Sequence, residues 1–172
     1  MDGRDFFIGD THFFHKNIIG YENRPFSSVE EMNNKLIQNW NYTVKKTDRI
    51  FHLGDFSFGN KQMQIEIGQK LNGYKVLILG NHDRYNIRHY IDCGFNEVIK
   101  YPIVLDGFWI LSHKPMYINK NMPYANIFAH VHGNPEYTDY SDQTICVSVE
   151  RKHMNYAPIS FDRIKTIMGI LE

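Results

Sequence analysis

The sequence predicts one domain that contains both α-helices and β-strands. Its first half alternates short apolar runs, which are typical of buried strands, with segments of helical spacing. Its second half holds further short apolar runs separated by turns. The length of 172 residues favours a single domain over residues 1–172. Because strand–helix–strand order is the rhythm of parallel sheets, we expect a parallel sheet in the first half.

Composition and charge are those of an ordinary globular protein. Lys plus Arg and Asp plus Glu both number 19, and this balance argues against a dedicated nucleic-acid binder, which is usually basic. The two cysteines, Cys93 and Cys146, form no C-x-x-C pair, which fits a reducing compartment. No apolar run approaches the roughly 18 residues of a membrane span, and the N-terminal residues are charged. We therefore expect a cytoplasmic protein without membrane contact.

The pattern assigns an element to most of the chain. Strands are expected at 5–9, 49–53, 75–79, 98–101, 103–105, 108–111, 126–129 and 144–149. Helices are expected at 29–40, 61–71, 83–93 and 159–171. Ser28 is placed to cap the first helix, with Glu31 at the reciprocal capping-box position. Asp106-Gly107 is a hairpin turn signal.

Polar side chains follow five of the predicted strands. Residues two apart on extended backbone face the same side, so the pairs Asp10/His12 and His130/His132 can each converge. Open α/β sheets place ligands at the carboxyl ends of their strands. The polar residues at these ends are Asp10, His12, Asp55, Asn81, His82, Asp83, His113, His130 and His132.

Imidazoles and oxygen donors without a thiolate suit Mn, Fe, Zn or Ni. A single zinc needs about three or four protein ligands, so these donors are too many for one metal. The set fits two metals that share a bridging carboxylate. Two metals about 3.5–4 Å apart suit in-line displacement at phosphorus.

The ordered motifs Asp10-x-His12, Gly54-Asp55, Gly80-Asn81-His82-Asp83, His113 and His130-x-His132 resemble the calcineurin-like metallophosphoesterase superfamily. The resemblance is greatest to its small, single-domain bacterial and phage members. It implies an α+β fold: a four-layer αββα sandwich of two mixed β-sheets flanked by helices.

The resemblance also implies a role for each position. Asp55 would bridge two metal ions, and His82 would contact the phosphate or protonate the leaving oxygen, with Asp83 orienting it. The first metal would be held by Asp10, His12 and His132, and the second by Asn81, His113 and His130.

The sequence departs from the family pattern at three places. Gly9 stands where many members have serine, and Ala129 stands where many have glycine. Neither change removes a ligand, and Ala129 implies that its backbone need not adopt a positive φ. The residues after Asp55 lack the Asp-Arg extension of the Ser/Thr protein phosphatases, which disfavours that function.

We therefore expect a metal-dependent phosphoric ester hydrolase with two ions, Mn being the first choice. It would hydrolyse a small phosphodiester or phosphomonoester by in-line attack of a metal-bridging hydroxide. The alternatives are a nuclease acting on nucleic-acid ends and a catalytically silent binding scaffold. Oligomeric state, diester or monoester preference, and a helix-capping role for Asp83 are left open. His52 is predicted to pack on the opposite face of the sheet or in the core, and substrate contacts are left open for His15, Arg24, Arg84 and Arg151.

Overall fold

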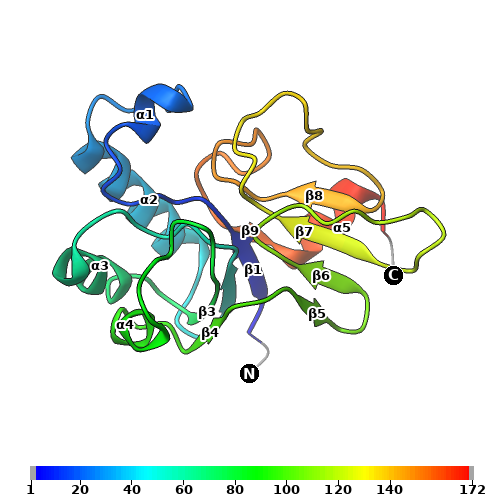
Figure 1. Cartoon of the computed structure of the whole chain (residues 1–172), viewed down its shortest axis with the longest axis horizontal. Helices are drawn as coiled ribbons and strands as arrows, with labels where there is room; N and C mark the ends of the chain where they lie inside the picture. The colour runs from blue at the N-terminus through cyan, green and yellow to red at the C-terminus, as the bar shows by residue number, and fades with distance from the viewer. Residues whose placement is uncertain (1–2, 171–172) are drawn as a thin grey trace.

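Two mixed β-sheets lie side by side in the computed structural model, which describes residues 3–170 (Figure 1). The sheets share one hydrophobic core, which includes Phe7 and Leu77 from the first sheet and Leu111 and Ile127 from the second. Helices cover the outside. The predicted sandwich of two mixed sheets flanked by helices is confirmed.

The first sheet has strand order β4-β3-β2-β1-β9. Strands β1 to β4 are parallel to one another, and β9 pairs antiparallel with β1. The parallel pairing follows from the helical crossovers that the sequence predicted. The strands are β1 (Asp5–Ile8), β2 (Arg49–His52), β3 (Tyr74–Ile78), β4 (Glu97–Ile99) and β9 (Ile159–Ser160).

The second sheet has strand order β5-β6-β7-β8. Strands β5 and β6 form the predicted antiparallel hairpin, and β6, β7 and β8 are parallel. Asp106 and Gly107, in the three-residue link of that hairpin, both adopt positive φ, as the central residues of a type I′ turn do, and the N–H of Phe108 donates to the carbonyl of Leu105 at 3.2 Å. The strands are β5 (Ile103–Leu105), β6 (Trp109–Leu111), β7 (Ala125–Phe128) and β8 (Thr144–Cys146).

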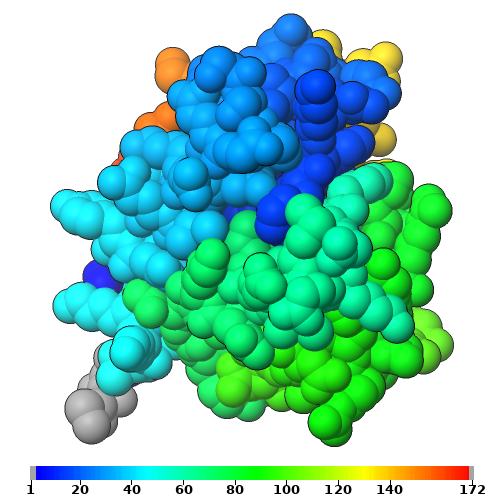
Figure 2. Space-filling view, turned by 90° about the vertical axis from the view of Figure 1, so that its left-hand side faces the viewer, coloured from blue at the N-terminus to red at the C-terminus, as the bar shows by residue number. Residues whose placement is uncertain are grey.

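Helices α1 to α4 lie on the side of the first sheet that faces away from the second (Figure 1). Figure 2 shows this face, which the chain from α2 to α4 covers in light blue to green. Helix α5 contacts β1, β8 and β9. No helix within residues 3–170 is long and apolar enough to cross a membrane. The helices are α1 (Ile18–Tyr21), α2 (Val29–Thr43), α3 (Lys61–Gly68), α4 (Ile87–Asp92) and α5 (Phe161–Met168).

Helix α2 begins where the sequence predicted. The hydroxyl of Ser28 accepts a hydrogen bond from the N–H of Glu31 at 3.1 Å. The Glu31 carboxylate accepts from the N–H of Ser27 rather than from that of Ser28. The predicted capping box is therefore present in a variant form, with its return bond one residue earlier.

The strand expected at 144–149 ends at Cys146 and the helix expected at 61–71 ends at Gly68, and three further local predictions also differ from the structure. The helix expected at 83–93 begins at Ile87, because Asn86 caps it and the Asp83 side chain is bonded elsewhere. The first two residues of the helix expected at 159–171 instead form β9, and α5 ends at Met168, where Gly169 caps it with φ 71°. Leu171 lies outside the described residues. The short helix α1 lies in a segment to which the sequence pattern assigned no element.

Backbone hydrogen bonds join the loops that follow the strands of both sheets. The N–H of Gly9 donates to the backbone carbonyl of Val147 at 2.9 Å, and the N–H of Asp10 donates to that of Gly54 at 3.0 Å. The N–H of Ala129 donates to the backbone carbonyl of His113 at 2.9 Å. The carboxyl ends of β1, β2, β6, β7 and β8 therefore meet at one edge of the sandwich.

Candidate metal centre

The first group of donors combines the loop after β1 with the loop after β7. The side-chain ligand atoms of Asp10, His12 and His132 all lie within 4.8 Å of one another. The Nε2 atoms of His12 and His132 are 3.2 Å apart. Asp10 and His12 are buried, so one carboxylate and two imidazoles point at the same small volume.

The second group combines the loops after β2, β6 and β7. The ligand atoms of Asp55, His113 and His130 also lie within 4.8 Å of one another. Nδ1 of His130 is 3.1 Å from Nε2 of His113, and Oδ1 of Asn81 is 2.9 Å from the same nitrogen. Nδ1 of His113 bonds the Leu53 carbonyl at 2.7 Å, which aims Nε2 into the group.

Asp55 lies between the two groups. Its Oδ2 atom is 3.6 Å from Nε2 of His12 in the first group and 3.6 Å from Nε2 of His113 in the second. Its Oδ1 atom accepts a hydrogen bond from the backbone N–H of His82 at 2.8 Å. One carboxylate therefore faces both sets of donors while its second oxygen is fixed.

The backbone at this centre is left-handed at five of the donor residues. Non-glycine residues rarely adopt positive φ, and such positions cluster at functional sites. The sequence argument placed Asp10/His12 and His130/His132 on extended backbone, and that reason is wrong, although both pairs do converge. The φ values are 54° at Asp10, 47° at His12, 58° at Asp55, 71° at His130 and 48° at His132.

Two glycines let the loops approach Asp55 and His113. A Cβ atom on Gly80 would lie 2.2 Å from Oδ1 of Asp55. A Cβ atom on Gly54, whose φ is 89°, would lie 2.6 Å from both the backbone N of Gly80 and Nδ1 of His113. Neither position has room for a side chain.

Asp10 has one oxygen free to face a cation. Its Oδ2 accepts from the hydroxyl of Ser148 at 2.5 Å and from the N–H of His130 at 2.7 Å. Its Oδ1 is buried and has no hydrogen-bond partner within residues 3–170. Burial raises the pKa of Asp10 to about 6, so the ionised carboxylate needs a compensating positive charge. The donor set therefore fits a divalent cation.

Glu150 supports this centre, and the sequence argument missed it. Its carboxylate is 3.2 Å from Nδ1 of His132 and forms a buried ion pair with Arg24. Burial opposes the charged form of His132, but the carboxylates of Asp10 and Glu150 outweigh burial and raise the pKa of His132 to about 9. Glu150 directly follows the strand expected at 144–149, so the search for polar residues after strands could have found it.

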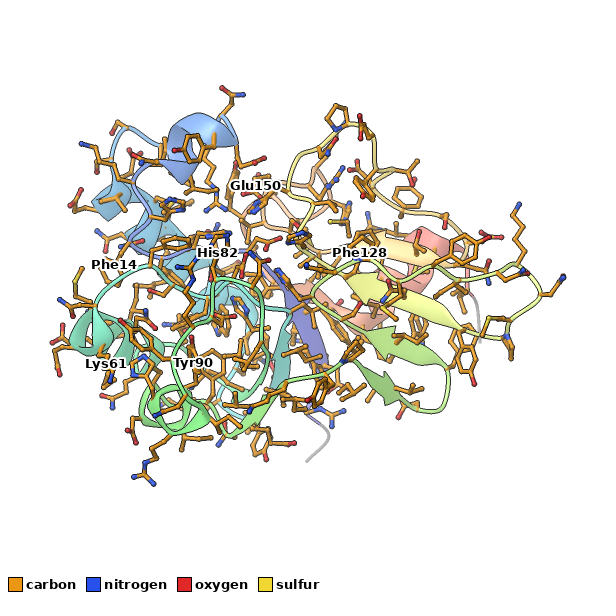
Figure 3. The ribbon with its side chains drawn as sticks, in the orientation of Figure 1. Phe14, Lys61, His82, Tyr90, Phe128 and Glu150 are labelled. Atoms are coloured by element: carbon orange, nitrogen blue, oxygen red, sulfur yellow. The ribbon has the colours of Figure 1, made fainter. Side chains whose placement is uncertain are left out.

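His82, which Figure 3 shows near the middle of the molecule, lies beside His12 of the first donor group. Its ring centroid is 5.7 Å from that of His12 and 4.9 Å from that of Phe58. Phe58 is 41% exposed and stacks on His15 with centroids 3.9 Å apart. His15 and Phe58 therefore form an aromatic wall next to His82.

Asp83 is buried under the loops that carry Asp55 and Asn81. Its carboxylate accepts hydrogen bonds from the N–H groups of Gly80 and Asp55 at 2.8 Å and of Phe56 at 3.0 Å. Burial raises the pKa of Asp83. All of these bonds go to backbone groups rather than to the ring of His82, so Asp83 fixes the loop that presents Asp55.

The remaining candidates are three arginines and His52. Arg24 and Arg151 are buried. Arg24 bonds Glu150 and the carbonyls of Asp10 and Thr11, and Arg151 pairs with Asp139. Neither guanidinium is free for substrate, whereas Arg84 is exposed. His52 lies in the core as predicted, with Nε2 2.9 Å from the hydroxyl of Thr11.

A sandwich of two mixed sheets that carries two groups of metal donors at one edge is the arrangement expected of a metal-dependent phosphoesterase. The chain belongs to the calcineurin-like phosphoesterase family, whose model matches residues 6–163. The predicted family membership is confirmed.

Relatives span archaea, bacteria and phages. The chain is 38% identical over 165 residues to the uncharacterized protein MJ1445 of Methanocaldococcus jannaschii, covering 92% of this chain and 88% of that protein. It is 38% identical over 80 residues to the Gene 66 protein of Mycobacterium phage L5, which is 45% of this chain and 38% of the phage protein.

Two solved structures share the fold. The protein of unknown function AQ665 from Aquifex aeolicus is 28% identical with a TM-score of 0.73, over 96% of this chain and 100% of that one. The Pseudomonas putida nuclease MPE is 20% identical with a TM-score of 0.52, over 75% of this chain and 62% of the nuclease.

Proposed function

We propose that this chain is a dinuclear metal-dependent phosphoesterase that hydrolyses a small phosphodiester or phosphomonoester. The observation that carries the proposal is the position of Asp55. A carboxylate oxygen 3.6 Å from an imidazole nitrogen of each donor group suits a ligand shared by two ions. Family membership supports the same reaction class.

Seven side chains would hold the two ions. Asp10, His12 and His132 would bind one, and Asn81, His113 and His130 the other, with Asp55 shared. Mn²⁺ is our first choice because this mixture of imidazole and oxygen donors suits it; Fe, Zn and Ni suit the same donors. When bound, the ions supply a nucleophile from water near neutral pH and neutralise charge on the phosphoryl oxygens.

His82 is the proposed catalytic side chain beyond the ligands. It lies next to His12 at the centre and is partly exposed, so its imidazole can meet a bound phosphoester. We propose that it contacts the phosphate or gives a proton to the leaving oxygen. Asp83 acts as a positioning residue, because its bonds hold the backbone of Asp55 and Gly80.

A nuclease acting on nucleic-acid ends is the second candidate. The printed name of the Pseudomonas putida neighbour is compatible with it, although that likeness concerns the fold. The formal net charge of zero argues against binding a long polyanion. A silent binding scaffold is disfavoured because the donor groups are complete and His82 lies beside them.

The test is hydrolysis by metal-stripped protein that is then resupplied with Mn²⁺. A bis-aryl phosphodiester and an aryl phosphomonoester are compared, and the metal bound per chain is measured. We expect Mn²⁺ to restore turnover, Asp55→Asn to abolish it and His82→Ala to lower it about 10²–10⁴-fold. Asp92→Asn, which changes an exposed carboxylate on α4, is the matched control.

Two outcomes would contradict the proposal. If two ions bind and neither ester is hydrolysed, general phosphoesterase activity is refuted and the scaffold is favoured. If Asp55→Asn binds as much metal and hydrolyses the esters as fast as Asp92→Asn, the assignment of Asp55 as a shared ligand is wrong.

A further inference from the structure

A pocket adjoins the second donor group. It has a volume of about 400 Å³ and lies between the end of β3, the link from β4 to β5 and the loop after β6. Asn81 and His113, two of the proposed ligands, form part of its wall. Ligand pockets commonly measure about 300–1,000 Å³. A group attached to phosphorus at the metal centre can therefore extend into this pocket.

The wall of the pocket is mostly apolar. Leu79, Pro102 and Met116 line it. The one hydroxyl there, on Ser112, is already engaged: it donates to the carbonyl of Lys114 at 2.7 Å and accepts from Asn126 at 2.9 Å. The side chains that line this pocket therefore suit an apolar ring and offer little to distinguish one heterocycle from another.

Two lysines add positive charge to this apolar wall. Lys100 and Lys114 both line the pocket and are exposed. Within residues 3–170, neither ammonium group has a hydrogen-bond or ion-pair partner. Two uncompensated cations beside a ring-sized apolar pocket suit a ligand that carries an anion in addition to the reacting phosphoryl group.

We propose that this pocket binds the organic group of the substrate, and that Lys100 and Lys114 select a ring-bearing group with a second phosphate, as in a nucleotide. The proposal rests on the proposed phosphoesterase function and narrows its substrate class. In the reaction, water adds to phosphorus, the bond from phosphorus to the leaving oxygen breaks, and that oxygen takes up a proton. The second phosphate stays intact in the pocket and serves only for recognition.

The test compares two diesters that differ by one phosphate: thymidine 5′-(p-nitrophenyl phosphate) and the same compound with a 3′-phosphate. For the Mn²⁺-loaded protein we expect the 3′-phosphate to lower KM. Lys100→Ala and Lys114→Ala should each raise KM about five- to tenfold for the phosphorylated probe only, with kcat unchanged. Lys70→Ala, an exposed lysine outside the pocket, is the matched control.

A binding measurement separates this proposal from the phosphoesterase function. Calorimetric titration with thymidine 3′,5′-bisphosphate needs no turnover, and we expect binding that Lys100→Ala and Lys114→Ala both weaken. If no ester is hydrolysed but this binding holds, the function fails and the pocket assignment stands. The pocket assignment is overturned if both lysine variants match Lys70→Ala in KM and in binding, or if the wild-type protein does not bind the bisphosphate.

Discussion

Gly9 and Ala129 share a space that has room for one methyl group. A Cβ atom built on Gly9 would lie 2.4 Å from the Cβ of Ala129. Each residue directly precedes a proposed ligand, Asp10 or His130, and the N–H of His130 donates to Oδ2 of Asp10 at 2.7 Å. The two departures from the family pattern therefore compensate each other. Glycine at position 9, where many members have serine, leaves room for alanine at position 129, where many have glycine.

Gly9→Ser should destabilise the protein by about 1–3 kcal/mol, because its Cβ overlaps Ala129 in a packed interior. The double variant Gly9→Ser with Ala129→Gly should recover most of that loss. Urea denaturation of the four proteins of this cycle measures the coupling between the two positions. Additive effects would show that the two residues do not compete for the same space.

Glu150→Gln should weaken Mn²⁺ binding about 10–100-fold, since outer-shell carboxylates orient metal-binding imidazoles. Glutamine keeps an acceptor near Nδ1 of His132 but removes the negative charge. Calorimetric titration with Mn²⁺ measures the effect. Asp139→Asn is the matched control, because it breaks the ion pair with Arg151 away from the donor groups. Equal Mn²⁺ affinity in the two variants would exclude an orienting role for Glu150.

His52 should make the metal-free protein less stable in acid. Burial lowers the pKa of His52 from 6.5 to about 3, so a proton binds the unfolded chain more tightly than the folded one. Its contribution to stability is complete above pH 6.5 and is lost as pH falls toward 3, by up to about 1.4 kcal/mol per pH unit.

The measurement is the free energy of unfolding in urea at pH 7 and pH 5, with a chelator present. His52→Gln can still donate to Thr11 and does not titrate, so it should lose less stability than the wild-type protein over this interval. Equal losses in the two proteins would show that His52 does not govern the acid sensitivity.

Metal removal should lower the melting temperature. Ion binding to the folded state alone stabilises it by about 2.7 kcal/mol when the free ion is at 100 times its Kd. The ions also compensate the buried charge of Asp10, whose pKa burial raises to about 6. Thermal unfolding with a chelator and with Mn²⁺ measures the shift, which Asp55→Asn should lack and Asp92→Asn should keep. Identical melting curves for the wild-type protein in the two conditions would argue against a resident metal.

The fold and the composition of the donor groups could be predicted because both follow from local pattern. Apolar runs that end in glycine and a polar residue mark buried strands whose ends reach one edge of a sheet. Asp10 and Asp55 each follow such a run, and the structure places one of them in each donor group. The order of these motifs then identified the family, which in turn implied the sandwich.

Other features depend on contacts that a local pattern does not contain. The left-handed backbone of His12 and His132 could not be predicted from their residue types, because non-glycine residues rarely adopt positive φ. Arginine is usually a surface residue, so the sequence did not predict that Arg24 is buried. Its guanidinium pairs with Glu150, which is 126 positions away in the chain. Asp83 suited a helix cap, but three backbone N–H groups from two loops take its carboxylate instead.

The antiparallel pairing of β1 with β9 has a consequence for synthesis of the chain. Phe6 and Phe7 pair with Ser160 and Ile159, so β1 has no partner on that side until the ribosome has made residue 160. An unpaired apolar strand is a template for aggregation. During translation the nascent first sheet therefore carries an open edge, and chaperone capture at that stage would protect it. Because β9 is made after every proposed ligand, this edge closes only when the chain already contains all of its proposed metal-binding residues.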